Sequence, residues 1–485
     1  MASTVMQKVP LFKLEEGDRD DEVTGLAGLP IIHQFMKRSG LCQQIKKHLK
    51  LKECGWSEVE LLETIVMLVA AGGEHLDDVR MLAADKALQE LLGKQKESSD
   101  DPADEGAKNA MGAIPSAKAL ERFLKLFHDD GQTHPGEGQA WVPEETEALK
   151  GLAEVNRWFV KRMIERKKIT RATIEDDAVA VESHKRGLFG MYKGGLGYMP
   201  VNGAIAELGC VAADEFRDGN CTPSYDVLRF FKETLKSLPE SVTEICARFD
   251  GAYYNHELLG FMQKRGIQYT VTGKLSSSIV EWIGALPEAQ WKPLEKVTPE
   301  GMRESGKEWT EMPWGSANGS QEDIRKRVLR TVITRKKAHQ WELWKGEHAD
   351  AAEKDRYEVI VTNRDWAGDR LIRWHYERGG SIEHVHDRVK NDLAGHVLPC
   401  AEFGANAAWW RLQCLALNIV RAIQLEILPE EFRDCHLKRL RFHLFCIAGR
   451  VIRHARELIL KLSRGHPSFA MYRDALARIG SPAFS

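Results

Sequence analysis

Between residues 170 and 274 the chain alternates short β-branched runs with amphipathic stretches, and this alternation constrains the fold most. Three strand candidates come first, one in RATIEDDAVAVES and two in VNGAIAELGCVAADEF. A helix is expected over residues 222–239, with Thr222 as its cap and Pro223 in its first turn. A strand in EICARF, a helix in HELLGFMQK and a strand in IQYTVT follow. This succession predicts an α/β fold built around one sheet.

The regions on either side of this core have different patterns. Helices are expected over residues 25–93, where Ser57 and Glu60 have capping-box spacing, and again over 114–127 and about 143–168. The stretch 93–113 between them is polar, acidic and rich in Gly and Ala, which predicts a mobile segment. Residues 285–365 are Trp-rich, basic and strand-prone, and the chain after Trp366 reads as helical to about 465 with no strand signal.

Three strands, a helix, a strand, a helix and a strand is the element order of the ribonuclease H-like α/β fold. We therefore expect such a core, interrupted by a β-rich insertion and flanked by helical regions. The expected parts are a helical N-terminal DNA-binding region over 1–168 (mobile acidic segment about 93–113), the first part of the core over 169–284, the insertion over 285–365, the rest of the core over 366–400, and a helical C-terminal region over 401–485.

Composition describes an ordinary globular protein, with 43% hydrophobic and 29% charged residues and a net charge of −2. The total charge does not indicate a nucleic-acid partner, although local patches rather than totals steer a polyanion. Nine scattered cysteines without a CxxC pair argue against a disulfide framework or a zinc module. The start of the chain lacks the apolar region of a signal peptide, and no apolar stretch is long enough to span a membrane. We expect a cytoplasmic protein.

Two aspartates occupy strand positions where active-site residues of α/β proteins are found. Asp177 lies in a strand otherwise rich in Ala and Val, and Asp250 ends the apolar strand EICARF. An acid at the carboxyl end of a strand points into the crevice where such folds bind ligands. Each could equally be a turn or capping residue. Neighbouring acids complicate the assignment: strand alternation puts Glu175 on the face of Asp177 and Asp176 on the opposite face, so Asp176 is the weaker candidate.

A third acid, Glu383, lies in YERGGSIEHVHDRVK at equal spacing between Tyr376 and Lys390. Seven residues are close to two helical turns, so Glu383 and Lys390 are expected on one helix face. A carboxylate and an ammonium so placed could hold a metal ion and a nearby phosphate. A solvated helix face with a ladder of charges is the plain alternative.

This segment resembles the Y-x2-R-x3-E-x6-K signature of DDE transposases from bacterial insertion sequences. The whole chain resembles the branch called DDE transposase group one, through DAVAVESHK (177–185), YKGGLGY (192–198), RFDGAYY (248–254), the opening DEVTGLAGLP and IPSAKALERFL. The interval of 133 residues between Asp250 and Glu383 can contain the β-rich insertion that such enzymes carry. One position departs from the signature: Gly379 stands where the arginine is expected, and Arg378 comes one residue early. The Arg-Gly-Gly run also risks breaking the helix before Glu383.

The resemblance implies an enzyme that cuts DNA at the ends of a mobile element and joins the ends to a target. It implies Asp177, Asp250 and Glu383 as catalytic, metal-binding carboxylates, with Mg²⁺ as cofactor and Mn²⁺ able to substitute. It also implies double-stranded DNA as partner, a homodimer in a synaptic complex, and DNA contacts from Tyr376, Arg378 and Lys390.

A second set of DNA contacts is suggested by charge alone. RKRVLRTVITRKK (325–337) holds seven Lys and Arg residues and no acid. Such a segment could follow a phosphate backbone through Arg325, Lys326, Arg327 and Arg330, or it could be a sheet edge guarded by cations. The segment 435–464 carries eight Lys and Arg residues, which predicts a core helix with a basic outer face.

Two other functions remain open at this stage. A host-adapted nuclease on the same fold would cut DNA without joining it. A catalytically inactive descendant of a transposase would bind DNA as a regulator, although the intact set of three acids speaks against decay.

Overall fold

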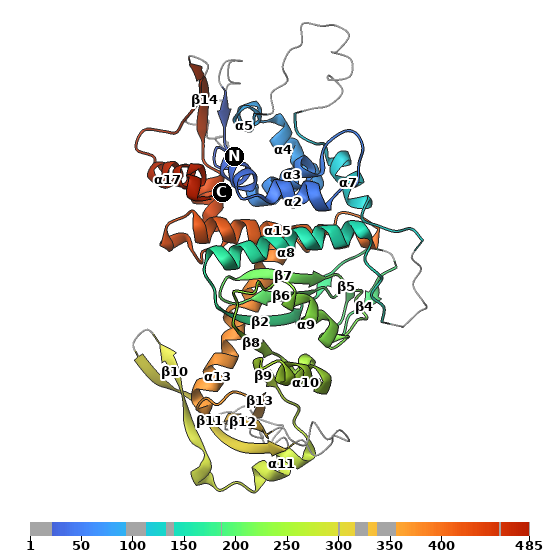
Figure 1. Cartoon of the computed structure of the whole chain (residues 1–485), viewed down its shortest axis with the longest axis vertical. Coiled ribbons are helices and arrows are strands. Elements are labelled where there is room, and N and C mark those ends of the chain that lie inside the picture. Colours follow the sequence, from blue (N-terminus) through green and yellow to red (C-terminus); the bar gives the residue numbers. More distant parts are fainter. Residues whose placement is uncertain are drawn as a thin grey trace, which may run out of the picture.

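The computed structural model describes residues 22–93, 113–131, 140–185, 187–298, 301–315, 328–336, 356–454 and 457–484. Figure 1 shows three levels: the N-terminal helices with the C-terminal segment, then the long helices α8 and α15, then a sheet that continues into the lower end of the molecule. The expected acidic mobile segment lies almost entirely outside the described residues.

Helices dominate the N-terminal region, as the sequence predicts. The Ser57 hydroxyl accepts from the Glu60 backbone N–H, and the Glu60 carboxylate accepts from the Ser57 backbone N–H. The predicted capping box is therefore confirmed. The elements are β1 (Val23–Thr24), α1 (Pro30–Arg38), α2 (Leu41–His48), α3 (Glu58–Ala71), α4 (Val79–Ala84), α5 (Lys86–Leu91), α7 (Ala117–Lys125) and α8 (Glu147–Arg166).

The core strands and helices follow the predicted succession. They are β2 (Arg171–Ala178), β6 (Val201–Ile205), β7 (Cys210–Glu215), α9 (Val227–Leu235), β8 (Glu244–Phe249), α10 (His256–Lys264) and β9 (Gln268–Thr272). They lie side by side in the order β7-β6-β2-β8-β9. β6 pairs antiparallel with both β7 and β2, whereas β2, β8 and β9 run parallel to one another. The fold is therefore mixed α/β with a mixed central sheet, and β2 is its middle strand.

Between β2 and β6 the chain forms a small separate sheet that the sequence reading did not resolve. It contains β3 (Val181–Glu182), β4 (Phe189–Gly190) and β5 (Leu196–Tyr198), in the order β3-β5-β4. The turn between β4 and β5 carries Gly194 and Gly195 at φ 89° and 76°, a region that glycine occupies without strain. Lys193 lies in this turn, and its side chain is exposed.

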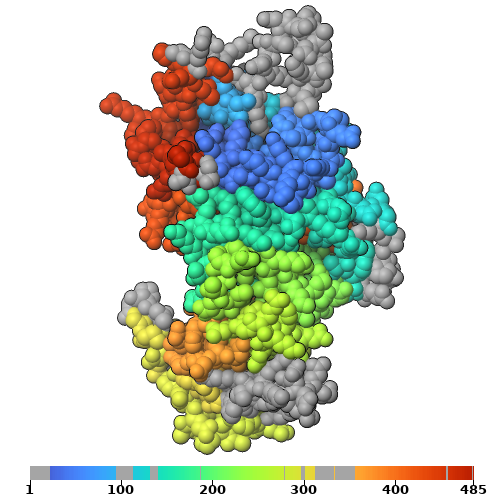
Figure 2. Space-filling model, viewed as in Figure 1, coloured from blue at the N-terminus to red at the C-terminus, as the bar shows by residue number. Residues whose placement is uncertain are grey.

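The strand-prone segment after α11 (Ser277–Gly284) extends the same sheet. Its strands are β10 (Lys292–Thr298), β11 (Gly301–Gly315), β12 (Val328–Lys336) and β13 (Arg356–Thr362). β13 pairs antiparallel with β9, so these four strands and the core form one nine-stranded sheet. Figure 2 shows β10 and β11, in yellow, projecting from the lower part of the molecule.

After the sheet, the chain returns as helices across it. α13 (Gly368–Tyr376) is attached to β9 through His375, whose two ring nitrogens lie 2.9 and 3.1 Å from the hydroxyls of Thr270 and Thr272. A 3-10 turn over Glu377–Gly380 then interrupts the helix, as the Arg-Gly-Gly run predicts. α14 (Ile382–Asp387) follows and passes into a π-helical turn over Arg388–Asp392.

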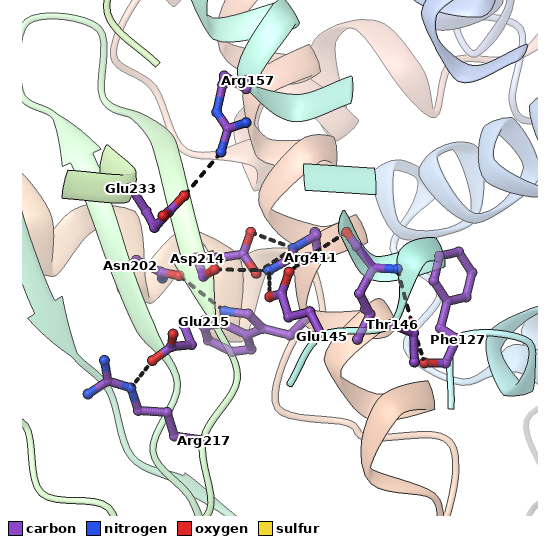
Figure 3. A network of polar contacts seen from close by, with 12 residues as sticks. Phe127, Glu145, Thr146, Arg157, Asn202, Asp214, Glu215, Arg217, Glu233 and Arg411 are labelled. Atoms are coloured by element: carbon purple, nitrogen blue, oxygen red, sulfur yellow. Dashed lines mark hydrogen bonds and ion pairs between the residues drawn. The ribbon is translucent and has the colours of Figure 1, made fainter. Parts of the chain in front are cut away.

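The long helix α15 (Phe403–Glu426) is held to the sheet by buried charged groups (Figure 3). The guanidinium of Arg411 donates to the Asp214 carboxylate on β7 at 3.0 Å and to Glu145 at 2.6 and 3.1 Å. Trp410 donates to Asn202 on β6 at 3.1 Å. Because buried charges are costly unless paired, this network fixes where α15 crosses the sheet.

The expectation of a strand-free helical C-terminal region is wrong. α16 (Leu437–Leu440) is short, a π-helical turn covers Arg441–Phe445, and the chain then forms a hairpin of β14 (Gly449–His454) and β15 (Glu457–Lys461) before α17 (Phe469–Gly480). β14 pairs with β1, at the other end of the described chain. Val451 and Ile452 suit a strand, but helical spacing of the upstream leucines masked the change, and the pairing partner is too distant in sequence to be seen.

Candidate active site

Asp177 and Asp250 lie at the same edge of the sheet. Asp177 is the penultimate residue of β2, and Asp250 directly follows β8. These strands are adjacent and parallel, so their carboxyl ends meet at one edge. The sequence prediction that places both acids at strand ends is confirmed.

The Asp177 carboxylate is strongly influenced by its surroundings. Burial and the negative charge of Asp250 raise its pKa to about 6, while the positive charges of Arg378 and Lys193 oppose that rise. Its Oδ1 accepts from the Ala178 backbone N–H at 2.8 Å. A carboxylate whose pKa is raised by a second carboxylate is a typical arrangement at a cation-binding site.

Asp250 is anchored by the backbone rather than by a cation. Its carboxylate accepts from the Ala252 N–H at 2.9 Å and caps the 3-10 turn Gly251–Tyr253. The alternative of a capping role for Asp250 is thus confirmed, and it is compatible with a role in a site, because capping orients the carboxylate and uses one of its two oxygens.

The predicted third acid, Glu383, lies on α14, which packs against the end of β2. The ring of His386, one helical turn after Glu383, hydrogen-bonds to the backbone of Asp177. A Cβ at Gly379 would lie 3.8 Å from the Glu383 carboxylate, in ordinary contact. The Glu383 side chain is exposed to solvent, and among the described residues it does not form a cluster of three acids with Asp177 and Asp250.

Arg378 lies beside Asp177, with a guanidinium nitrogen 3.8 Å from its carboxylate. The side chains of both residues are largely buried. The arginine that comes one residue before the signature position therefore reaches the candidate site. The 3-10 turn that breaks the helix at Glu377–Gly380 gives Arg378 this direction.

The two acids that precede Asp177, which are Glu175 and Asp176, interact with side chains outside the candidate site. Glu175 is fully buried, forms an ion pair with Arg248 at 2.6 Å and accepts from the Ser381 hydroxyl just before α14. Asp176 lies on the other face, where the Thr234 hydroxyl of α9 donates to it at 3.0 Å. Burial raises the pKa of Asp176 to about 8. The expected alternation along β2 is confirmed, and Glu175 serves to tie β2, β8 and α14 together.

The residues that we expected to contact DNA are dispersed. The Tyr376 hydroxyl donates to Glu358 of β13, on the insertion side of α13. The Lys390 amine donates to the Ala180 carbonyl at 2.9 Å, just beyond β2. Arg325, Lys326 and Arg327 lie outside the described residues. Arg330 lies in β12, which is paired on both sides by β11 and β13, so the alternative of a guarded sheet edge is wrong for this strand.

Three residues near the site were not singled out from the sequence. Lys193, on the glycine-rich turn, lowers the pKa of Asp177 through its charge, and His386 is buried against the same strand end. Arg248 links the sheet to α13 and the following turn, since it also donates to the Trp374 carbonyl at 2.7 Å. Arg248 is the first residue of the RFDGAYY motif, but the sequence does not reveal its partner Glu175, which lies 73 residues away along the chain.

The family model described as "Transposase DDE domain group 1" matches residues 16–482. The chain belongs to this family. Among solved structures, it is similar to a piggyBac transposase synaptic complex with hairpin DNA, at 8% sequence identity and a TM-score of 0.42, over 95% of this chain and 82% of that chain. No curated protein matches the sequence.

Membership of the DDE transposase family indicates transposase or nuclease chemistry, which in such proteins generally uses a divalent metal ion. Asp177 and Asp250 fit such an ion, because a cation would offset both the burial of the Asp177 carboxylate and its repulsion by Asp250, which together raise the pKa of Asp177. Within the described residues, no three His, Cys, Asp or Glu side chains are clustered closely enough to hold a metal ion. Among the described residues, the carboxylates that meet at this edge of the sheet are therefore those of Asp177 and Asp250.

Over the residues that the structure describes, none of the helices has the length and apolar character needed to cross a bilayer.

Proposed function

We propose that this protein is a DDE transposase that cleaves DNA at the ends of a mobile element and transfers the strands to a target. The proposal places the reaction on a ribonuclease H-like core formed by β2, β6, β7, β8 and β9. One observation carries it: Asp177 and Asp250 meet at the carboxyl edge of two adjacent parallel strands, where burial and then the charge of Asp250 raise the pKa of Asp177. Paired carboxylates at such an edge suit cation-assisted chemistry on a phosphodiester.

In this proposal Asp177 and Asp250 hold Mg²⁺, and Glu383 completes the ligand set from α14. Mn²⁺ can replace Mg²⁺, since both accept hard oxygen ligands. When bound, the metal supplies activation of the attacking oxygen and stabilisation of the leaving one. Because Glu383 is exposed and the three carboxylates are not clustered, α14 has to adjust when DNA and metal bind.

Besides the metal ion, the proposed site contains a positively charged side chain, that of Arg378. Its guanidinium lies 3.8 Å from Asp177 and can turn its N–H groups toward a phosphate at the same edge. Lys193 contributes a second positive charge from the glycine-rich turn. Together they offset the repulsion between a phosphodiester and the carboxylates. Tyr376 and Lys390 remain predicted DNA contacts, and so do Arg325, Lys326, Arg327 and Arg330.

The partner in this proposal is double-stranded DNA, both as element ends and as target. A homodimer in a synaptic complex would hold two ends together, because strand transfer joins both ends to one target. Family membership supports DNA as the substrate.

The test uses DNA fragments that carry the sequences flanking the gene. The wild-type protein with Mg²⁺ should nick or cut at inverted repeats, whereas Asp177→Ala, Asp250→Ala and Glu383→Ala should each abolish cleavage and retain binding. Asp77→Ala, which removes an exposed acid on the N-terminal helices, is the matched control. If one of the three variants keeps near-normal cleavage, that residue is not part of the site.

Two outcomes would favour the alternatives. Cleavage without any strand-transfer product would indicate a host-adapted nuclease. Binding to the flanking DNA without cleavage by the wild-type protein would indicate a catalytically inactive regulator derived from a transposase.

A further inference from the structure

A cavity of about 490 Å³ lies at the other end of β2, on the side covered by α13. Figure 2 shows α13, in orange, at the surface beside the yellow β10–β11 strands. Arginines and tryptophans line most of the cavity: Arg171, Arg248, Arg370 and Arg373 with Trp366 and Trp374, next to Thr173, Ala206, Glu207 and Glu377. The proposed catalytic residues are not among these lining residues.

Guanidinium groups and indole rings alternate along this cavity. The guanidinium carbon of Arg370 lies 3.8 Å from the ring centre of Trp366, and Arg364 lies 3.6 Å from the same ring. Arg364 also lies 4.4 Å from the ring of Trp374, and Arg248 lies 5.0 Å from it. Stacking occupies the faces of the guanidinium planes and leaves their N–H edges able to donate. The stack also restrains these long side chains, so less entropy is lost when they bind a ligand.

Some of the arginines around the cavity are already paired with carboxylates, whereas two of them could still bind a ligand. Arg248 is paired with Glu175 and Glu377, and Arg373 is paired with Asp369 at 2.8 Å. The Glu207 carboxylate accepts from both the backbone N–H and the hydroxyl of Thr173, at 2.8 and 2.7 Å.

By contrast, Arg171 and Arg370 are exposed, and neither forms an ion pair with any other residue that the structure describes. Arg171 begins β2, and its charge also bears on Arg364. The exposed guanidinium groups of Arg171 and Arg370, beside the stacked guanidinium of Arg364, suit the binding of an anion.

We propose that this cavity binds the phosphodiester backbone of the DNA at a distance from the cleaved bond. The proposal rests on the proposed function, since it takes the DNA held at Asp177 as the occupant. Arg171 and Asp177 are six residues apart on one strand, which corresponds to about 20 Å. That length matches about six base pairs of B-DNA. In this proposal the duplex lies along β2, so the cavity contacts phosphates about six base pairs from the cut and sets the direction in which the duplex leaves the site.

The experiment compares duplex binding by the full-length wild-type protein, Arg171→Gln, Arg370→Gln and the double variant, with EDTA present so that no cleavage occurs. The probe is a labelled duplex of mixed sequence. Each lost phosphate contact should lower the slope of log K against log salt by roughly 0.9, and affinity should fall several-fold for every sequence. Arg473→Gln, which removes an exposed arginine on α17, is the matched control.

Arg370→Lys separates charge from stacking. Lysine keeps the positive charge but loses the planar group, so the salt slope should stay near the wild-type value while affinity falls. Thermal melting of each variant shows whether it is folded. Wild-type slopes and affinities in the double variant would overturn the proposal. So would weaker binding of ATP alone with unchanged duplex binding, because the cavity would then be a free-nucleotide site.

The outcome is independent of the test of the proposed function. If the wild-type protein does not cleave, but the double variant still weakens duplex binding, the cavity is a DNA contact and the catalytic proposal fails. If cleavage depends on Asp177 and Asp250, but the double variant binds as the wild type does, only the cavity proposal fails.

Discussion

The guanidinium of Arg378 lies 3.8 Å from the carboxylate of Asp177, although the family signature expects its arginine one position later, at Gly379. The 3-10 turn over Glu377–Gly380 brings the earlier residue into place. The residue one position before the signature arginine thus supplies a guanidinium beside Asp177.

Arg378→Gln should lower the rate of DNA cleavage about 100-fold, because one cationic donor is lost near the reacting phosphate. The double variant Arg378→Gly, Gly379→Arg restores the signature spacing, and a Cβ at position 379 has room. Single-turnover cleavage with Mg²⁺ measures both. If the double variant cleaves no better than Arg378→Gln, the position of the guanidinium, rather than its presence, is what this site requires.

Asp177→Asn should stabilise the metal-free protein at neutral pH. The pKa of Asp177 is about 6 in the folded protein against an ordinary 3.8, so the folded state binds more protons between these values. Stability therefore falls as pH rises from about 4 to about 6 and remains lower above that. The shift corresponds to about 2–3 kcal/mol.

Urea unfolding in EDTA across this pH range checks the prediction: the wild type should lose stability with rising pH more steeply than Asp177→Asn. Parallel pH profiles for the two proteins would show that Asp177 is not the group responsible.

Mg²⁺ should raise the melting temperature of the wild-type protein. A ligand that binds only the folded state stabilises it by mass action, by about 2.7 kcal/mol at 100 times its Kd. Asp177→Asn and Asp250→Asn should show a much smaller increase, whereas Asp77→Asn should respond as the wild type does. Differential scanning fluorimetry against Mg²⁺ concentration measures this. An equal response in all four proteins would place the metal elsewhere.

Arg248→Met should destabilise the protein by about 3–5 kcal/mol, because it leaves the fully buried Glu175 without its ion pair. Glu175→Gln combined with Arg248→Met should recover much of that loss, since no charge then remains uncompensated. Chemical denaturation of the two variants and of Glu175→Gln alone gives the coupling energy between the residues. Additive effects would mean that the pair does not act as a unit.

The sequence predicts those parts of the fold that depend on neighbouring residues. Strand alternation placed Glu175 and Asp176 on opposite faces, and the Arg-Gly-Gly run predicted the break before α14. Both depend on local backbone geometry. The acids Asp177 and Asp250 were found because each ends a strand, and their meeting requires only that the two strands be adjacent and parallel.

The parts that were missed depend on distant partners. The hairpin β14–β15 was read as helix because the leucines before it follow helical spacing, and its pairing with Val23–Thr24 has no local signal. The joining of β13 to β9 also connects segments that are far apart in sequence. Neither the Arg378–Asp177 contact nor the cavity beside Arg171 follows from spacing along the chain, since each requires the helices to have packed on the sheet.

The pairing of β1 with β14 joins the two ends of the chain. Val23 lies opposite Arg450, the Ala27 carbonyl accepts from the Tyr472 hydroxyl, and Gly28 is in close contact with the backbone of Leu444. The N-terminal helices consequently cannot complete their packing until the segment around residues 444–472 has been synthesised. A product of premature termination upstream of residue 449 lacks that support, so fragments of this protein should be more sensitive to proteolysis than the intact chain.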